Sequence, residues 1–135
     1  GIRKLPTSLG KLIHLRYLDL SNNGFQRLPN SIFELHNLQY LDLSQCRYLN
    51  QMPKGMNKLV NLRHLLGPKT DCMLHFPPGL GNLTNLQTLD TFIAGTGQDR
   101  KIRCIAANKS LRHGRLGDLK RLNNLQGELS IYIKG

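Results

Sequence analysis

The stretch Leu15-Arg16-Tyr17-Leu18-Asp19-Leu20-Ser21-Asn22-Asn23 decides the fold, because its leucines follow the spacing L-x-x-L-x-L and an asparagine closes it. Leu18 and Leu20 alternate with more polar residues, which is the period of two expected for a strand with one buried and one solvent-facing side. The frame returns as Leu38-Gln39-Tyr40-Leu41-Asp42-Leu43-Ser44-Gln45-Cys46. We therefore expect equivalent strands at both places.

The segments before these strands repeat in the same register. Four units begin at Leu5-Pro6, Leu28-Pro29, Met52-Pro53 and Phe76-Pro77, at intervals of 23, 24 and 24 residues. Intervals of this length are typical of leucine-rich repeats. Repeats are expected near 5–27, 28–51, 52–75 and 76–93, followed by an insertion near 94–115 and a further repeat over 116–135.

Each unit carries the same local signals. In the first unit Leu9, Leu12 and Leu15 recur every three positions, which suits a 3₁₀ helix or a single helical turn. The proline before them cannot continue a strand ladder because it has no N–H. We therefore predict an α/β solenoid of leucine-rich repeats, with a parallel concave sheet and short 3₁₀ or helical convex segments.

The predicted core consists of leucines that recur once per unit. The strand leucines expected to be buried are Leu18, Leu20, Leu41, Leu43, Leu65 and Leu89. Those expected beneath them are Leu12, Leu15, Leu35, Leu38, Leu59, Leu62, Leu83 and Leu86. Exposure of Leu18 and Leu41 together with burial of Tyr17 and Tyr40 would contradict this register.

Two places depart from the regular frame. Leu66-Gly67-Pro68 lacks the second strand leucine of its unit, so we expect a short strand and an irregular loop there. In the second repeat Cys46 stands where the first repeat has Asn23, whose amide is expected to bond backbone groups where the chain leaves the strand.

The opening Ile2-x-x-Leu5-Pro6 matches Phe25-x-x-Leu28-Pro29, so we expect an uncapped fragment that begins within a repeat.

Composition narrows the partners and the compartment. The formal net charge is +11, a basic bias that favours an acidic partner or an acidic neighbouring domain. Three cysteines without paired spacing argue against a disulfide framework and favour a cytoplasmic protein. No apolar run approaches the length needed for a membrane span.

Candidate chemical motifs are weak. Asp19, Asp42 and Asp90 share one expected column, and carboxylates about 4.8 Å apart can form an acid/base dyad, but an open surface favours a structural column. Cys72-x-x-His75 is half of a zinc pattern without its second half. No lysine follows Gly95-Thr96-Gly97 at the position that a phosphate-binding loop requires. We expect no enzyme activity, and no metal or cofactor in this segment.

Two surfaces are candidate binding sites. The first is the concave face, for which we expect a protein partner and the contact residues Arg16, Tyr17, Asp19, Gln39, Tyr40, Asp42, Arg63, His64, Gln87 and Thr88. The second is the basic insertion, whose cationic residues are Arg100, Lys101, Arg103, Lys109, Arg112 and Arg115. Asp99 is the one acidic residue between Gly97 and Arg115, so the net charge of this stretch is +5. The insertion is either a solvated loop or a site for an acidic protein surface; nucleic acid is disfavoured because no aromatic residues interleave with the basic ones.

The whole chain resembles the start of the repeat region of plant intracellular disease-resistance proteins that carry a nucleotide-binding domain. The resemblance rests on Leu5-Pro6-Thr7-Ser8-Leu9-Gly10-Lys11-Leu12, on the two strand frames, and on Leu83-Thr84-Asn85-Leu86-Gln87-Thr88-Leu89. The closing Leu125-Gln126-Gly127-Glu128-Leu129-Ser130-Ile131 is its most specific part, because generic leucine-rich repeats lack it.

The resemblance implies an innate immune receptor whose repeats sense pathogen products or guarded host proteins. It also implies that the repeats fold back on the receptor's own nucleotide-binding module and hold it in the ADP-bound resting state. ADP and ATP would bind that absent module and not this segment. The alternative is a free-standing plant intracellular leucine-rich-repeat scaffold, which shares the Leu-Pro-x-Ser-Leu/Ile units but not the closing stretch.

Overall fold

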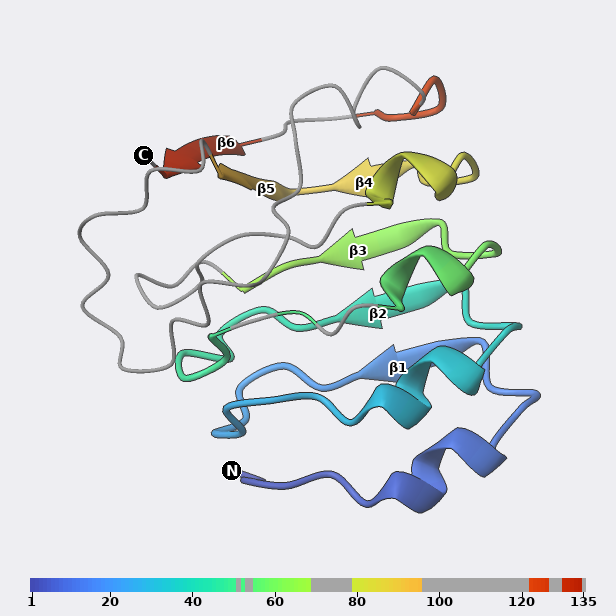
Figure 1. Ribbon diagram of the computed structural model, residues 1–135, viewed down its shortest axis with the longest axis vertical. Coiled ribbons are helices and arrows are strands. Elements are labelled where there is room, and N and C mark those ends of the chain that lie inside the picture. The colour runs from blue at the N-terminus through green and yellow to red at the C-terminus, as the bar shows by residue number, and fades with distance from the viewer. Residues whose placement is uncertain (51, 53–54, 69–78, 96–121, 127–129, 135) are drawn as a thin grey trace.

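The computed structural model describes residues 1–50, 52, 55–68, 79–95, 122–126 and 130–134, with the backbone alone for 91–95 and 130–134. The chain winds in successive turns, and each turn places a short 3₁₀ helix on the same side of a parallel sheet (Figure 1). The helices have three to five residues, so none in the part of the chain described is long and apolar enough to cross a membrane.

Four helix–strand pairs follow one another in chain order: η1 (Thr7–Lys11) and β1 (Tyr17–Asp19), η2 (Asn30–Glu34) and β2 (Tyr40–Asp42), η3 (Met56–Lys58) and β3 (His64–Leu66), η4 (Leu80–Asn82) and β4 (Thr88–Leu89). The first four strands form one sheet in the order β1-β2-β3-β4, and neighbouring strands are parallel. A second parallel sheet pairs β5 (Thr91–Gly95) with β6 (Ser130–Lys134). The predicted fold class is confirmed.

The prolines set the start of the first two helices. Pro6 and Pro29 have φ near −68° and ψ of 145°, which is extended backbone, and η1 and η2 begin at the next residue. Leu9 N–H then donates to the carbonyl of Pro6 over 3.2 Å, and Leu12 N–H donates to the carbonyl of Leu9 over 3.1 Å. These i to i+3 bonds are those of a 3₁₀ helix, as the three-residue spacing of the leucines predicts.

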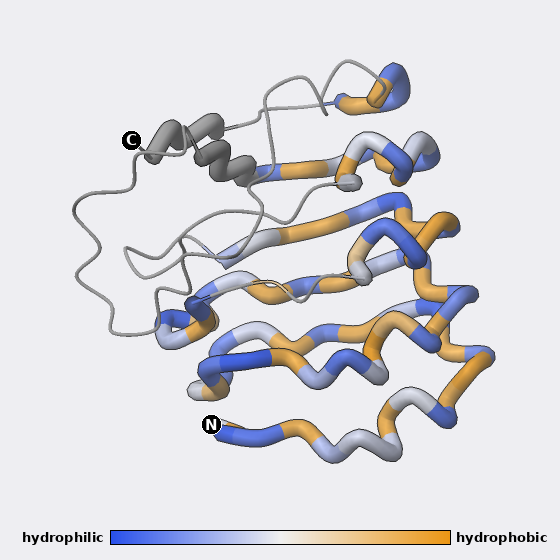
Figure 2. The backbone as a smooth tube through the Cα atoms, in the orientation of Figure 1, coloured by the Kyte–Doolittle hydropathy of each residue, from blue (hydrophilic) through white to orange (hydrophobic). Residues whose placement is uncertain are grey.

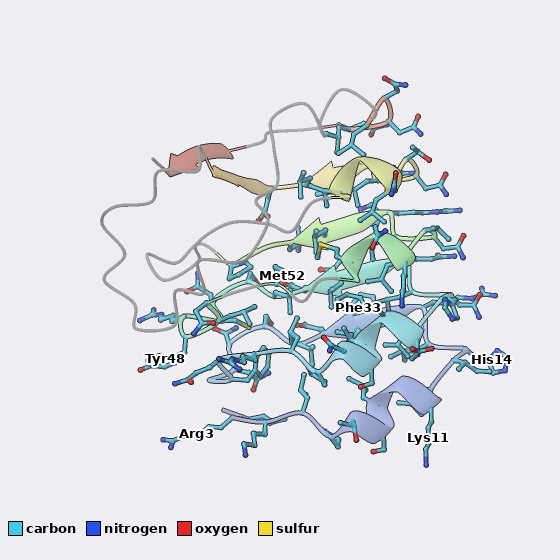
Figure 3. All side chains as sticks on the ribbon, viewed as in Figure 1. Arg3, Lys11, His14, Phe33, Tyr48 and Met52 are labelled. Carbon is cyan, nitrogen blue, oxygen red and sulfur yellow. The ribbon has the colours of Figure 1, made fainter. Side chains whose placement is uncertain are left out.

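The core lies between the sheet and the row of helices. The register aligns Leu18, Leu41, Leu65 and Leu89 across β1 to β4, and Leu41 is only 1% exposed. Hydrophobic segments recur at corresponding places in successive turns (Figure 2). Figure 3 shows Phe33 within the stack, where it is buried. Because Tyr17 is exposed while Leu41 is buried, the strands face the way the sequence predicts.

The first turn is the exception, and the prediction that Leu12 is buried is wrong. Leu12 is 53% exposed, and Leu15 and Leu18 are only partly buried, whereas the equivalent Leu35, Leu38 and Leu41 are buried. A repeat covers its leucines with the turns on both sides of it, and among the described helices and strands those of the first turn pack mainly on those of the second.

The third turn keeps its strand despite its irregular sequence. β3 has three residues, as β1 and β2 have, and Leu66 pairs with Asp42. After β3, Gly67 occupies the position that Leu43 occupies after β2. The N–H of Gly67 donates to Asp90 Oδ1 over 2.8 Å. Residues 69–78, where we expect the irregular loop, lie outside the described chain.

The turn residues after the strands behave as predicted. Asn23 Nδ2 donates to the carbonyls of Leu20 and Ser21 over 3.0 and 3.2 Å, and its Oδ1 accepts the N–H of Ile2 over 2.9 Å. In the next turn Cys46 is fully buried and its thiol donates to the carbonyl of Leu20 over 3.1 Å. Burial raises the pKa of this thiol, so the thiol stays protonated and able to donate.

Residues 122–126 lie against the fourth turn in the expected register. Leu122 is buried like Leu83, and Gln126 N–H donates to the carbonyl of Gln87 over 2.7 Å. β5 ends at Gly95, so the first two residues of the expected insertion belong to a strand. The basic residues of that insertion lie outside the described residues.

We expect Leu41→Ala to lower the free energy of unfolding by about 2–5 kcal/mol, because it leaves a cavity between the sheet and the helices. Leu12→Ala is the matched control, since this leucine is 53% exposed, and we expect a much smaller loss. Urea denaturation of both variants measures the difference. Equal losses would contradict the described core.

Candidate interaction surface on the concave face

The face of the sheet that points away from the 3₁₀ helices, here called the concave face, carries three columns of side chains. They arise because strands about 4.8 Å apart hold equivalent residues in register. We name them the entry column (Arg16, Gln39, Arg63, Gln87), the aromatic column (Tyr17, Tyr40, His64, Thr88) and the carboxylate column (Asp19, Asp42, Leu66, Asp90). All ten residues predicted to form the concave contact surface are in these columns.

The entry column rests on a continuous backbone ladder. The carbonyl of Arg16 accepts the N–H of Gln39 over 2.8 Å, that of Gln39 accepts the N–H of Arg63 over 2.8 Å, and that of Arg63 accepts the N–H of Gln87 over 2.7 Å. Arg16 and Arg63 are exposed, whereas Gln39 and Gln87 are half-buried. The two guanidinium groups are therefore presented to solvent from a fixed backbone.

The aromatic column is a stack that crosses the strands. The rings of Tyr17 and Tyr40 are parallel within 8°, with centroids 4.3 Å apart. His64 follows with its centroid 6.0 Å from that of Tyr40, and its Nδ1 lies 3.0 Å from Thr88 Oγ1. Tyr17 at the end of the stack is 59% exposed. The column thus holds its aromatic rings in defined orientations.

The aspartates of the carboxylate column accept hydrogen bonds from backbone N–H groups at the ends of the strands. Asp19 Oδ1 accepts the N–H of Ser21 over 2.9 Å, and Asp42 Oδ1 accepts the N–H of Ser44 over 2.8 Å. The Ser21 hydroxyl and N–H lower the pKa of Asp19, because both donate to its charged form. This role explains why Asp recurs here without invoking an acid/base dyad.

Tyr40 is linked to the carboxylate column through its own hydroxyl. Its OH donates to Asp42 Oδ2 over 3.3 Å, and Asp42 is only 9% exposed. Burial, followed by the negative charge of Asp42 and the neighbouring Tyr17, raises the pKa of Tyr40 to about 12. Both oxygens of Asp42 are therefore engaged within the sheet, whereas Asp19 is exposed.

A row of asparagines that the sequence analysis did not single out ties successive turns together. Each donates from Nδ2 to a carbonyl of the preceding turn: Asn37 to Ile13 (2.8 Å), Asn61 to His36 (2.8 Å), Asn85 to Val60 (3.1 Å) and Asn124 to Thr84 (2.9 Å). The signal was available, since an asparagine immediately precedes the leucine that opens each of these strand frames. The row helps to keep the columns in register.

Other candidate chemistry is not supported by the structure that is described. Among residues with a described side chain, the one ion pair joins His36 Nε2 to Glu34 Oε2 at 4.0 Å, and no cluster of His, Cys, Asp or Glu could hold a metal. The half zinc pattern Cys72–His75 lies outside the described residues, and so do Thr96 and Gly97 of the glycine-rich stretch.

Comparisons with known proteins agree with this architecture. A family model described as a leucine-rich repeat region matches residues 5–132. A probable disease resistance protein of Arabidopsis thaliana is 35% identical over 98% of this chain, which spans 13% of that protein's length. The structure of a leucine-rich-repeat protein of Leptospira interrogans superposes with a TM-score of 0.68 at 26% identity, covering 98% of this chain and 30% of that one. The resemblance drawn from the sequence is confirmed.

We expect Asp42→Asn to lower the pKa of Tyr40 part of the way from about 12 toward 10.0, because the substitution removes a negative charge while burial remains. NMR titration of the tyrosine ring carbons in the alkaline range measures this. Asp19→Asn is the control and should leave the pKa of Tyr40 unchanged.

The raised pKa of Tyr40 makes the free energy of unfolding depend on pH. Below pH 10 both states hold the proton and the contribution of Tyr40 is fully present; as pH rises toward about 12, the unfolded state loses the proton first and stability falls. A Tyr40→Phe variant should lose less stability over this window than the parent. An equal loss would contradict the shift.

Proposed function

The chain belongs to the leucine-rich repeat family, and from this premise we propose that it is the protein-interaction segment of a plant immune receptor. In this proposal the concave face recognises pathogen effectors or guarded host proteins. The family's fold is a protein-interaction scaffold, and it presents the three columns from a hydrogen-bonded sheet. The exposed aromatic stack is the observation that carries the proposal.

We expect a few residues on the concave face to contribute most of the binding free energy. Tyrosine and arginine are enriched among residues that dominate binding energies. Tyr17 and Arg63 are exposed, and Tyr40 lies between Tyr17 and His64. The backbone ladder already orders the chain at these positions, so binding needs to order only side chains. We therefore assign the main contacts to Tyr17, Tyr40 and Arg63.

The immune role rests on the similarity to the Arabidopsis disease resistance protein, of which this chain covers a small part. A nucleotide-binding module elsewhere in the longer chain would hold ADP or ATP, and the receptor would act in the cytoplasm. The absence of a membrane-spanning helix among the described residues is compatible with that location.

We also propose that the basic insertion contributes to autoinhibition of that module by docking on an acidic patch. The support is its charge, six basic residues against Asp99 over 97–115. Each exposed ion pair contributes only about 0–1 kcal/mol. Several acting together shift a two-state receptor by a few kcal/mol, which is enough to change a small active population.

The first test replaces Tyr17, Tyr40 and Arg63 with alanine in the full-length receptor. We expect partner capture to weaken by more than about tenfold, because the variant removes the anchors while the core leucines remain. The control replaces Lys11, His14 and Tyr48, which are exposed and lie outside the three columns (Figure 3). Co-precipitation and the immune response report the outcome, and unchanged capture by the concave variant would place the site elsewhere.

The second test reverses Arg100, Lys101 and Arg103 to glutamate. If the insertion holds the receptor off, signalling without ligand rises, and high salt loosens the contact between the repeats and the module. Replacing Arg3, Lys4 and Arg27 with glutamate is a control of equal charge change outside the insertion. A reversed receptor that stays quiet and keeps the contact would show that the insertion is only a solvated loop.

A further inference from the structure

Arg63 lies between two glutamines in the entry column. It immediately precedes β3, which has β2 on one side and β4 on the other. The N–H of Arg63 donates to the carbonyl of Gln39 over 2.8 Å, and its own carbonyl accepts the N–H of Gln87 over 2.7 Å. The backbone of Arg63 is therefore held from both sides, and the neighbouring positions of the column carry carboxamides.

The fold does not use the polar side chains at these three positions. Arg63 is exposed, and Gln39 and Gln87 are half-buried. None of the three side chains has a hydrogen-bond or ion-pair partner among the residues that the structure describes. A guanidinium group has five N–H donors and a carboxamide has two. These donors are thus open to an acceptor from another molecule.

The carboxylate column differs in this respect. Both oxygens of Asp42 accept hydrogen bonds within the sheet, and Asp90 Oδ1 accepts the N–H of Gly67 over 2.8 Å. These carboxylates stabilise the turns, whereas the Arg63 guanidinium group stabilises nothing within the described chain. The concave face therefore carries positive charge along its entry column and negative charge along its carboxylate column.

We propose that Arg63, flanked by Gln39 and Gln87, binds the side-chain carboxylate of an aspartate or glutamate of the protein partner, an inference that rests on the proposed function. A guanidinium group donates two parallel hydrogen bonds to a carboxylate, and such charge-assisted bonds are about twice as strong as neutral ones. The carboxamides of the neighbouring turns donate to the remaining lone pairs of the carboxylate. The net charge of +11 attracts an acidic segment over a longer range.

The other columns restrict what else the partner carries. Nucleic acid has a negative charge on every nucleotide, so Asp19 and Asp90 repel it at the carboxylate column. A protein segment suits both sides of the face, because it places an acidic side chain at Arg63 and a neutral or basic one toward the aspartates. Between these columns lie the rings of Tyr40 and His64, which favour an apolar neighbour of the acidic residue.

The test measures how fast phenylglyoxal, a reagent that modifies guanidinium groups, reacts with Arg63 in the full-length protein, with mass spectrometry as the readout. The probe is an end-blocked peptide with one glutamate beside one leucine among glycines and serines, at an ionic strength of about 0.15 M. At about 10 mM it should slow modification of Arg63 about threefold, as a dissociation constant of about 5 mM requires. A peptide with glutamine in place of glutamate should leave the rate unchanged.

Two comparisons separate a specific site from general attraction to a basic protein. Arg47 is exposed and lies outside the concave columns, so neither peptide should slow its modification. Oligothymidylate at the same concentration of negative charge should slow modification of Arg63 less than the glutamate peptide does, because the carboxylate column repels it.

A carboxylate placed beside Arg63 should compete with the peptide. Gln87→Glu is isosteric and adds this carboxylate in the neighbouring turn, so the glutamate peptide should no longer slow modification of Arg63. Gln26→Glu is the matched control, because Gln26 is exposed outside the concave columns, and it should keep the threefold effect.

Equal slowing by the two peptides, equal slowing at Arg63 and Arg47, a full effect in Gln87→Glu, or stronger slowing by oligothymidylate would each overturn the carboxylate site. If one of these results appears while the Tyr17, Tyr40 and Arg63 alanine variant still loses its partner, the concave interaction surface stands and only its carboxylate chemistry is wrong. If that alanine variant also keeps its partner, both the proposed surface and the carboxylate site fail.

Discussion

The packing of leucines from one turn onto the next is the interaction on which the other features depend. A single turn has one strand and one 3₁₀ helix and cannot bury its own leucines, so turns on both sides are needed to complete its core. The contrast between Leu35, which is fully buried, and Leu12, which is 53% exposed, shows this dependence at two equivalent positions. Stability in this architecture belongs to the interfaces between turns.

That packing also determines what the concave face presents. Because the leucines fix the register of β1 to β4, the residues between them fall into columns, and the rings of Tyr17 and Tyr40 meet at 4.3 Å. The asparagine row and the backbone ladder oppose a slip of one turn against the next. The same packing that makes the core continuous therefore holds the concave columns in register.

Much of this was predictable from the sequence, because a repeat multiplies weak local signals. The parallel sheet, the 3₁₀ segments and the outward side of Tyr17 all follow from the alternation of leucines in register. Three things could not be read in this way. The exposure of Leu12 depends on whether a neighbouring turn covers it, which the leucine spacing within a repeat does not show. The Tyr17–Tyr40 stack depends on side-chain rotamers. The contact between Gly67 and Asp90 joins two turns whose sequences are irregular.

The claim that the concave face is where a partner binds is tested most directly by photo-crosslinking in the full-length protein. A photoreactive phenylalanine derivative replaces either Tyr17 or Tyr48, two tyrosines of nearly equal exposure, 59% and 63%, of which only Tyr17 is in the concave columns. The account predicts a protein adduct, dependent on infection or on the guarded host protein, from position 17 and none from position 48. An adduct from position 48 with none from position 17 would contradict it.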